Sequence, residues 1–110
     1  MNPPFTSEES IGMTTTPLFR PGRILATPGA LSALKHAGQH ASEFLSRHLA
    51  GDWGAVSVDD KAANDDSLRD GSRLLSAYVL ATAVKIWIIT EAGDDHGNRE
   101  ATTVLLPDEY

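Results

Sequence analysis

Cysteine is absent from the sequence, which excludes disulfides, thiolate metal sites and cysteine nucleophiles. No apolar run approaches the roughly 20 residues of a membrane-spanning helix. Residues 1–17, which include Glu8 and Glu9, lack the charged and apolar regions of a signal peptide. Basic residues are few, 9 against 15 acidic ones, and the net charge of -6 disfavours nonspecific binding to nucleic acid. We therefore expect a cytoplasmic protein that makes no membrane contact.

The length and composition predict one folded domain. A chain of 110 residues with 41% hydrophobic residues can build a single core. Residues 1–17 contain three prolines and several Ser and Thr but no apolar periodicity, so we predict a flexible N-terminal arm there. The α+β domain itself is predicted to cover residues 18–110.

The strongest secondary-structure signal is a β-forming run at residues 84–90. It places Val84, Ile86 and Ile88 on one face of a strand and Trp87 and Ile89 on the other, because successive side chains point to opposite faces. A strand that is apolar on both faces belongs inside a sheet. We predict strands at 73–80, 84–91 and 101–106, which together form an antiparallel C-terminal meander.

The preceding segments predict an edge strand and three helices. Prolines on both sides of residues 23–26 favour a short edge strand. Thr27-Pro28 has the capping and first-turn residues of a helix that ends at Gly38. Further helices are expected at 41–50 and 58–70, the latter capped by Ser57. Their predicted buried residues are Phe44, Leu45, His48 and Leu49 for the first, and Ala62, Ala63 and Leu68 for the second.

The predicted fold class is α+β: a small antiparallel sheet of three to four strands packed against two or three short helices. Three short helices would cover one face of this sheet. The other face, carrying either Trp87 and Ile89 or Ile86 and Ile88, then needs cover from the arm or from a partner. A homodimer or a protein-binding surface is therefore expected.

The most distinctive local string is Arg47-His48 followed by Gly51-Asp52-Trp53-Gly54. In one interpretation, His48 is a general acid or base oriented by Asp52, because an imidazole titrates near neutral pH. In the other, Trp53 fills the core where helix meets sheet, and Asp52 accepts hydrogen bonds from turn N–H groups. The second interpretation is favoured.

Basic and aromatic side chains lie on or beside the predicted sheet. Such groups can clamp phosphates and stack bases, as recognition of single-stranded RNA requires. In the simpler interpretation, these are ordinary surface side chains of the strands, and the tryptophan lies in the core. The residues concerned are Arg73, Tyr78, Lys85, Trp87 and Arg99.

Two other patterns have a structural explanation. His36 and His40 have the spacing of two metal ligands on a helix, but Gly38 interrupts that helix and no HExxH motif is present. We expect no metal site and no cofactor, and we expect His40 to help cap the second helix. Five aspartates on the helix at 58–70 either imitate a series of phosphates or form an ordinary solvated face.

Several strings together resemble a known family. They are Arg23–Leu31, Arg47-His48, Gly51–Gly54, Arg73–Tyr78, Trp87–Glu91 and Thr102–Pro107. With them, roughly residues 18–110 are similar to small uncharacterised proteins found on bacterial plasmids, integrative elements and prophages. The resemblance implies an accessory protein of a mobile element. We predict that it acts by binding another protein, for example as an antagonist of a host defence system, with Asp52, Trp53, Tyr78 and Trp87 as binding residues.

The predicted order of elements is also similar to that of RelE and barnase-like ribonucleases. This fold-level analogy implies a metal-independent toxin-type ribonuclease as the alternative function, with RNA as its partner. His48 would be the general base or acid and Trp87 or Tyr78 a stacking platform. The phosphate clamps would be Arg73, Lys85 or Arg99. This alternative requires His48 and at least two cations to converge in one open cleft.

Overall fold

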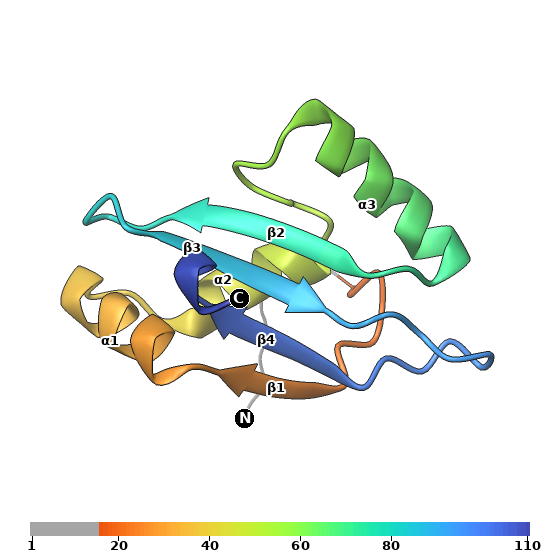
Figure 1. Cartoon of the computed structure of the whole chain (residues 1–110), viewed down its shortest axis with the longest axis horizontal. Coiled ribbons are helices and arrows are strands. Elements are labelled where there is room, and N and C mark those ends of the chain that lie inside the picture. Colours follow the sequence, from red (N-terminus) through yellow and green to blue (C-terminus); the bar gives the residue numbers. More distant parts are fainter. Residues whose placement is uncertain (1–15) are drawn as a thin grey trace, which may run out of the picture.

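A four-stranded sheet with two helices on one face forms the body of the protein, and a third helix lies beside the sheet (Figure 1). The structure is a computed structural model and describes residues 16–110, so the predicted arm, apart from Thr16 and Pro17, lies outside the described residues. The elements are β1 (Arg23–Ala26), α1 (Pro28–Ala37), α2 (Ala41–Leu49), α3 (Val58–Asp70), β2 (Leu74–Val79), β3 (Lys85–Thr90), β4 (Ala101–Leu105) and the 3-10 turn η1 (Pro107–Glu109).

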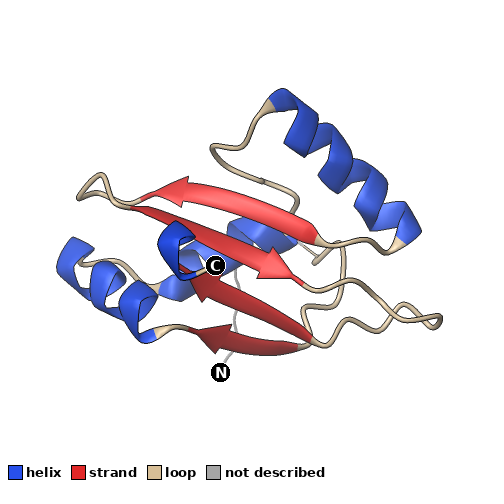
Figure 2. Cartoon of the chain, in the orientation of Figure 1, coloured by secondary structure: helices blue, strands red, loops and turns tan. Residues whose placement is uncertain are grey.

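The strand order is β1-β4-β3-β2, and the sheet is mixed (Figure 2). β2 pairs with β3 and β3 with β4 in the antiparallel sense, which gives the predicted meander. β1 pairs with β4 in the parallel sense, which the expectation of a purely antiparallel sheet did not include. β1 lies at the edge, as its flanking prolines predict. The α+β fold class is confirmed, although not all the strands are C-terminal.

The helix boundaries follow the predicted caps. The Thr27 hydroxyl accepts a hydrogen bond from the Ala30 N–H at 3.1 Å, and α1 ends at Gly38, whose φ is 67°. Ser57 caps α3 by accepting from the Asp60 N–H at 3.0 Å. His40 precedes α2 as predicted, but its side chain makes no capping hydrogen bond.

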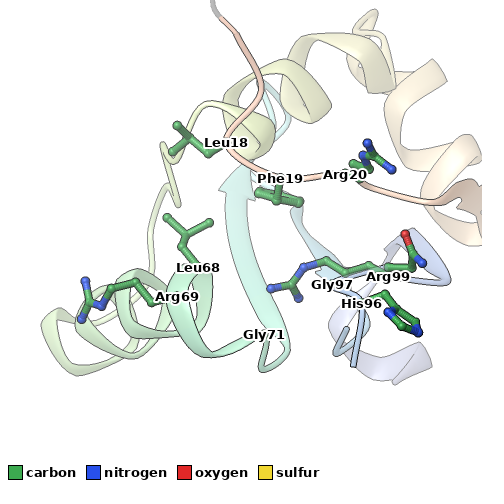
Figure 3. Close-up of a pocket in the computed structure, with 10 residues that line it drawn as sticks. Leu18, Phe19, Arg20, Leu68, Arg69, Gly71, His96, Gly97 and Arg99 are labelled. Carbon is green, nitrogen blue, oxygen red and sulfur yellow. The ribbon is translucent and has the colours of Figure 1, made fainter. Parts of the chain in front are cut away.

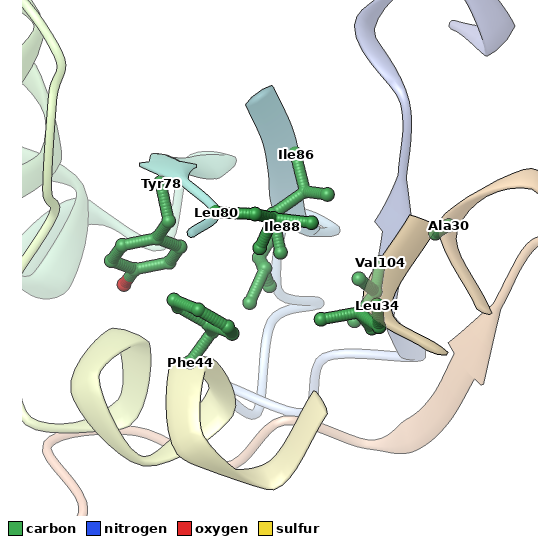
Figure 4. Packing of buried hydrophobic residues seen from close by; sticks show 8 residues of the cluster. All are labelled: Ala30, Leu34, Phe44, Tyr78, Leu80, Ile86, Ile88 and Val104. Atoms are coloured by element: carbon green, nitrogen blue, oxygen red, sulfur yellow. The ribbon is translucent and has the colours of Figure 1, made fainter. Parts of the chain in front are cut away.

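The main core lies between the sheet and the helices α1 and α2. Phe44 of α2 faces Tyr78 of β2, with ring centroids 5.3 Å apart (Figure 4). Burial of these side chains supplies the main favourable free energy of folding. The cluster consists of Ala30, Leu34, Phe44, Tyr78, Leu80, Ile86, Ile88 and Val104. Val84, expected beside Ile86 and Ile88, is exposed because it lies in the turn before β3.

Within residues 16–110, no α-helix lies on the opposite face of the sheet (Figure 1). Alternation along the strands places Trp87, Ile89 and Leu105 on this face. The turn η1 packs against β3 (Figure 1). The rings of Trp87 and Tyr110 meet edge to face, with centroids 5.9 Å apart. Part of the cover that we expected from the arm or a partner therefore comes from the chain's own residues 107–110.

Helix α3 runs along the outer edge of β2 instead of covering a face (Figure 1). The Asn64 side chain donates to the Leu75 carbonyl at 2.7 Å and accepts from the Leu75 N–H at 3.1 Å, as a neighbouring strand would. The predicted burial of Ala62 and Ala63 was therefore wrong, whereas Leu68 is half-buried. Ala62 and Ala63 are exposed, because the inward positions belong to polar groups that bond to backbone, Asn64 and Ser67.

The turn between β2 and β3, Ala81-Thr82-Ala83, lacks the Gly, Asn, Asp or Pro that tight turns favour. Ala83 has a φ of 74°, in the left-handed region that costs a residue with a Cβ atom free energy. Packing is not the only support of this turn, because Gln39 accepts a hydrogen bond from the Ala81 N–H at 2.9 Å.

Within residues 16–110, no helix has both the length and the apolar character needed to cross a membrane.

Candidate functional site

His48, the candidate acid or base, lies on α2 and is completely buried between the helix and the sheet. Its Nδ1 atom lies 2.5 Å from Ser76 Oγ on β2, and its Nε2 atom lies 2.8 Å from Thr90 Oγ1 on β3. Thr90 Oγ1 lies 2.7 Å from Thr102 Oγ1 on β4. One polar chain thus connects α2 to three strands, and all four of its side chains are fully buried.

The direction of hydrogen-bond donation along these side chains is determined at Thr102. The Thr102 hydroxyl donates to the Pro21 carbonyl at 2.8 Å, and a carbonyl can only accept. Thr102 has one proton, so the hydroxyl of Thr90 must donate to Thr102, and His48 Nε2–H must donate to Thr90. His48 is therefore the Nε2–H tautomer, and its Nδ1 accepts from the Ser76 hydroxyl. Every hydrogen-bonding atom of the ring is used.

Burial lowers the pKa of His48 from 6.5 to about 4, with a smaller contribution from the positive charge of Arg99. The imidazole is therefore neutral at physiological pH. A neutral imidazole has the charge state of a general base, but no substrate can reach this one. In this environment His48 acts as a hydrogen-bonding core residue.

Two aromatic rings close the site around His48. Phe19 and Trp53 both meet the imidazole edge to face, with centroids at 5.3 Å and 5.6 Å. Trp53 is buried, and its Nε1–H donates to Asp65 at 3.2 Å. This arrangement matches the interpretation in which Trp53 fills the core. Phe19 was missed as a site residue because it precedes β1 in an irregular segment without periodicity.

Arg99 lies close to this cluster, but its guanidinium is committed to backbone groups. It donates to the carbonyls of Ser72 at 2.7 Å, Glu91 at 3.0 Å and Ser67 at 3.0 Å. Because Ser67 lies in the last turn of α3, the cation also meets the negative end of that helix. Arg99 thereby joins α3, the approach to β2 and the end of β3. Burial lowers the pKa of Arg99.

The other two candidate clamps lie elsewhere. The Arg73 guanidinium contacts Tyr110 and donates to its hydroxyl. Lys85 is exposed and pairs with Val79 at the opposite end of β2 from Arg73. Only Arg99 of the three predicted clamps lies near His48. The described residues thus do not form the open cleft with converging cations that a ribonuclease of the predicted type requires.

Three of the four predicted binding residues lie together. The Tyr78 hydroxyl donates to the Asp52 carbonyl at 2.6 Å, and Trp53 follows directly. The Asp52 carboxylate is paired with Arg47 at 2.7 Å and accepts from the Gly54 N–H, and these bonds lower the pKa of Asp52. The Arg47 guanidinium covers the buried Tyr78 ring at 4.7 Å.

Of the three predicted binding residues Asp52, Trp53 and Tyr78, only Asp52 is solvent-accessible. It lies at the rim of a shallow hollow of about 390 Å³. Trp87 lies on the opposite face of the sheet.

A larger pocket of about 450 Å³ lies near Arg99 and is lined by Phe19, Arg20, Arg69 and His96 among others (Figure 3). Its basic character suggests an anion site. However, Arg69 is paired with Asp66 at 2.6 Å, and Arg99 donates three hydrogen bonds to backbone carbonyls. Figure 3 shows the ends of Arg20, Arg69 and His96 pointing in different directions. The cations therefore do not converge on one ligand position.

The two histidines with metal-ligand spacing do not form a site in the structure. His36 Nδ1 lies 2.8 Å from the Ser32 carbonyl within its own helix. Among the residues that the structure describes, no three His, Asp or Glu side chains gather closely enough to hold a metal ion.

The polar chain through His48 could have been suspected in part from the sequence. Ser76, Thr90 and Thr102 are hydroxyl residues at positions that alternation assigns to the same face as Ile86 and Ile88. A hydroxyl on a core-facing position needs a buried partner. The sequence does not indicate which partner, because the register between strands sets it.

Comparisons of the chain with family models, with curated proteins and with solved structures find no match.

Proposed function

We propose that this chain is a non-enzymatic accessory protein of a bacterial mobile element that works in the cytoplasm by binding another protein. The mobile-element part rests on the resemblance of the sequence strings. The binding part rests on one observation, the apolar sheet face that no α-helix of the described residues covers. A solvated face of an antiparallel sheet is ordinarily polar, whereas this face carries Leu75, Val79, Trp87, Ile89 and Leu105. Ile89 and Leu105 are buried, so the accessible apolar part of the face is Val79 with the half-buried Leu75 and Trp87.

The centre of the proposed surface is the pair Trp87 and Tyr110. Trp87 is half-buried, and Tyr110 is 72% exposed although its ring packs on Trp87. Val79 lies on the same face and is 54% exposed. Amphipathic aromatic side chains in such positions are typical anchors of protein interfaces.

Basic side chains flank this aromatic pair. Lys85 lies two residues before Trp87 on the same face, and Arg73 contacts the Tyr110 ring. We therefore expect a partner that presents an apolar patch bordered by carboxylates, such as a component of a host defence system. The buried, saturated state of His48 supports binding over catalysis.

The test is capture of partners from the host cytoplasm with the full chain, followed by titration of the purified partner. Lys85→Glu and Tyr110→Ser change exposed groups on the proposed surface. Val58→Ser is the matched control, because Val58 is highly exposed at the start of α3, away from that face. We expect both surface variants to weaken binding at least about tenfold, a loss of ~1.4 kcal/mol, and the control to leave it unchanged.

Two results would overturn the proposal. Binding that is equally strong in all three variants would exclude this surface. Cleavage of RNA by the purified chain that is lost in His48→Gln would make the protein an enzyme.

A further inference from the structure

Strand β1 presents an open edge. The backbone N–H and C=O groups of every second residue point toward β4. The Arg23 N–H donates to the Glu100 carbonyl, and the Thr27 N–H donates to the Val104 carbonyl. By the same alternation, the N–H and C=O groups of Ile24 and Ala26 point outward. Within residues 16–110, these four backbone groups have no hydrogen-bond partner.

The two edge strands of the sheet differ in what covers their outer backbone groups. On β2, Asn64 covers Leu75, and Ala77 pairs with the Trp53 carbonyl and the Ala55 N–H. On β1, no element of the described chain lies against the outer edge (Figure 2). Two of its side chains are apolar and accessible, with Ile24 49% and Leu25 40% exposed. Natural proteins usually protect an apolar edge, because it is a template for another strand.

We propose that a second copy of this chain occupies the edge, with the two β1 strands antiparallel and related by a twofold axis at Leu25. In this register Ile24 of each copy pairs with Ala26 of the other. Since these are the residues whose backbone groups point outward, all four open groups on each strand find partners. Four hydrogen bonds form between the strands, and Leu25 faces its own counterpart across the axis.

Charge complementarity supports this register. It sets Arg23 opposite Thr27 of the second copy, and the Thr27 hydroxyl holds the Glu109 carboxylate at 2.6 Å. Arg23 has no ion-pair partner in the part of the chain that the structure describes. Residues 23, 25 and 27 point to the face on which η1 lies, so Arg23 of one copy reaches Glu109 of the other, and symmetry makes the ion pair twice.

The expected dimer is weak. Two short strands bury less surface than the roughly 1,200 Å² of a typical stable interface, so association should depend on concentration in the micromolar range. The strand contact also leaves the face around Trp87 and Tyr110 open. This inference is therefore independent of the proposed binding partner.

The absence of native cysteine allows a direct test. In the proposed register, Leu25 and its counterpart form a non-hydrogen-bonded pair with Cα atoms about 4.5 Å apart, within the range that a disulfide can bridge. Leu25→Cys in the full chain, under mild oxidation, should become mostly a covalent dimer. Ile24→Cys should crosslink far less, because the two Ile24 Cα atoms would lie about 8 Å apart. Val79→Cys, equally accessible on β2, should remain monomeric.

Sedimentation of the unmodified chain and of Arg23→Glu provides the second measurement. The wild type should dimerise reversibly, and Arg23→Glu should weaken the dimer about tenfold by placing like charges across the interface. Equal crosslinking at positions 24, 25 and 79, or a wild type that stays monomeric at millimolar concentration, would overturn the proposal. A dimer that Arg23→Glu does not affect would contradict the register.

Discussion

The Thr27 hydroxyl donates to the Glu109 carboxylate at 2.6 Å and accepts from the Ala30 N–H at 3.1 Å. One side chain thus caps α1 and holds a residue 82 positions away in the sequence. The same carboxylate oxygen accepts from the Leu106 N–H at 2.8 Å. These bonds, that from Thr27 first, lower the pKa of Glu109. The junction of β1 and α1 is thereby joined to η1.

Removing this hydroxyl should destabilise both ends of the link. Thr27→Val keeps the shape of the side chain but removes the cap and the bond to Glu109. We expect the free energy of unfolding to fall by about 1–2 kcal/mol. Urea denaturation would measure the loss, and Thr27→Ser, which retains the hydroxyl, should stay within about 0.5 kcal/mol of wild type. Equal losses in the two variants would mean that the hydroxyl does not matter.

Stability should fall as the pH decreases through the range in which unfolded His48 takes up a proton. Its pKa is about 4 in the folded protein and 6.5 when exposed, so between these values the unfolded chain binds more protons. From above pH 6.5 down to pH 4, the loss is on the order of 3 kcal/mol. Denaturation at several pH values would show this slope.

The control for the pH effect is a comparison of histidines. His48→Gln should be less stable than wild type at neutral pH but should lack most of this slope. His36→Gln removes an exposed imidazole and should leave the slope intact. A slope that survives in His48→Gln would assign the effect to other groups.

The left-handed conformation of Ala83 offers a stabilising substitution. Glycine has no Cβ atom to clash at a φ of 74°, so Ala83→Gly should relieve strain. The greater flexibility of glycine in the unfolded chain offsets part of this gain, which leaves about 0.5–1 kcal/mol of added stability. Thermal unfolding would measure it. Ala81→Gly, at a position without positive φ, should instead lower stability.

Replacing the amide nitrogen of Asn64 by an oxygen should destabilise the protein. In Asn64→Asp the amide that donates to the Leu75 carbonyl becomes a carboxylate oxygen, so the carbonyl loses its donor and faces a negative charge. We expect a loss of about 2 kcal/mol or more. Ser42→Asp adds the same charge at an exposed position in the first turn of α2, near the positive end of the helix dipole, and should cost little. Similar values for the two variants in urea denaturation would show that Asn64 does not support the edge.

Most of the local structure could be predicted from the sequence. Thr27, Ser57 and Gly38 act through neighbouring backbone, so capping residues alone predicted the ends of α1 and the start of α3. The alternation in residues 84–90 likewise placed Ile86 and Ile88 in the core. These features depend on contacts within a few residues, which a pattern can reveal.

The long-range relationships were not predictable in the same way. Asn64 is polar in a polar helix, and nothing nearby indicates that Leu75 needs its amide. The parallel pairing of β1 with β4 depends on how the chain returns after three helices. Full burial of His48 also depends on Phe19 and on three hydroxyls brought together by strand register. The interpretation of His48 as an acid or base considered its chemistry without this environment.

The covered edge of β2 limits what this sheet can build. A sheet with two open edges can add copies at both and grow into a filament. Here Asn64 bonds to Leu75 and the segment Trp53–Ala55 bonds to Ala77, so that within residues 16–110 only Val79 is left free on that edge. Pairing at β1 would use up the other edge. Assembly through the sheet edges would therefore stop at two copies. The inward polar side of α3 would prevent polymerisation by keeping further strands from adding to β2.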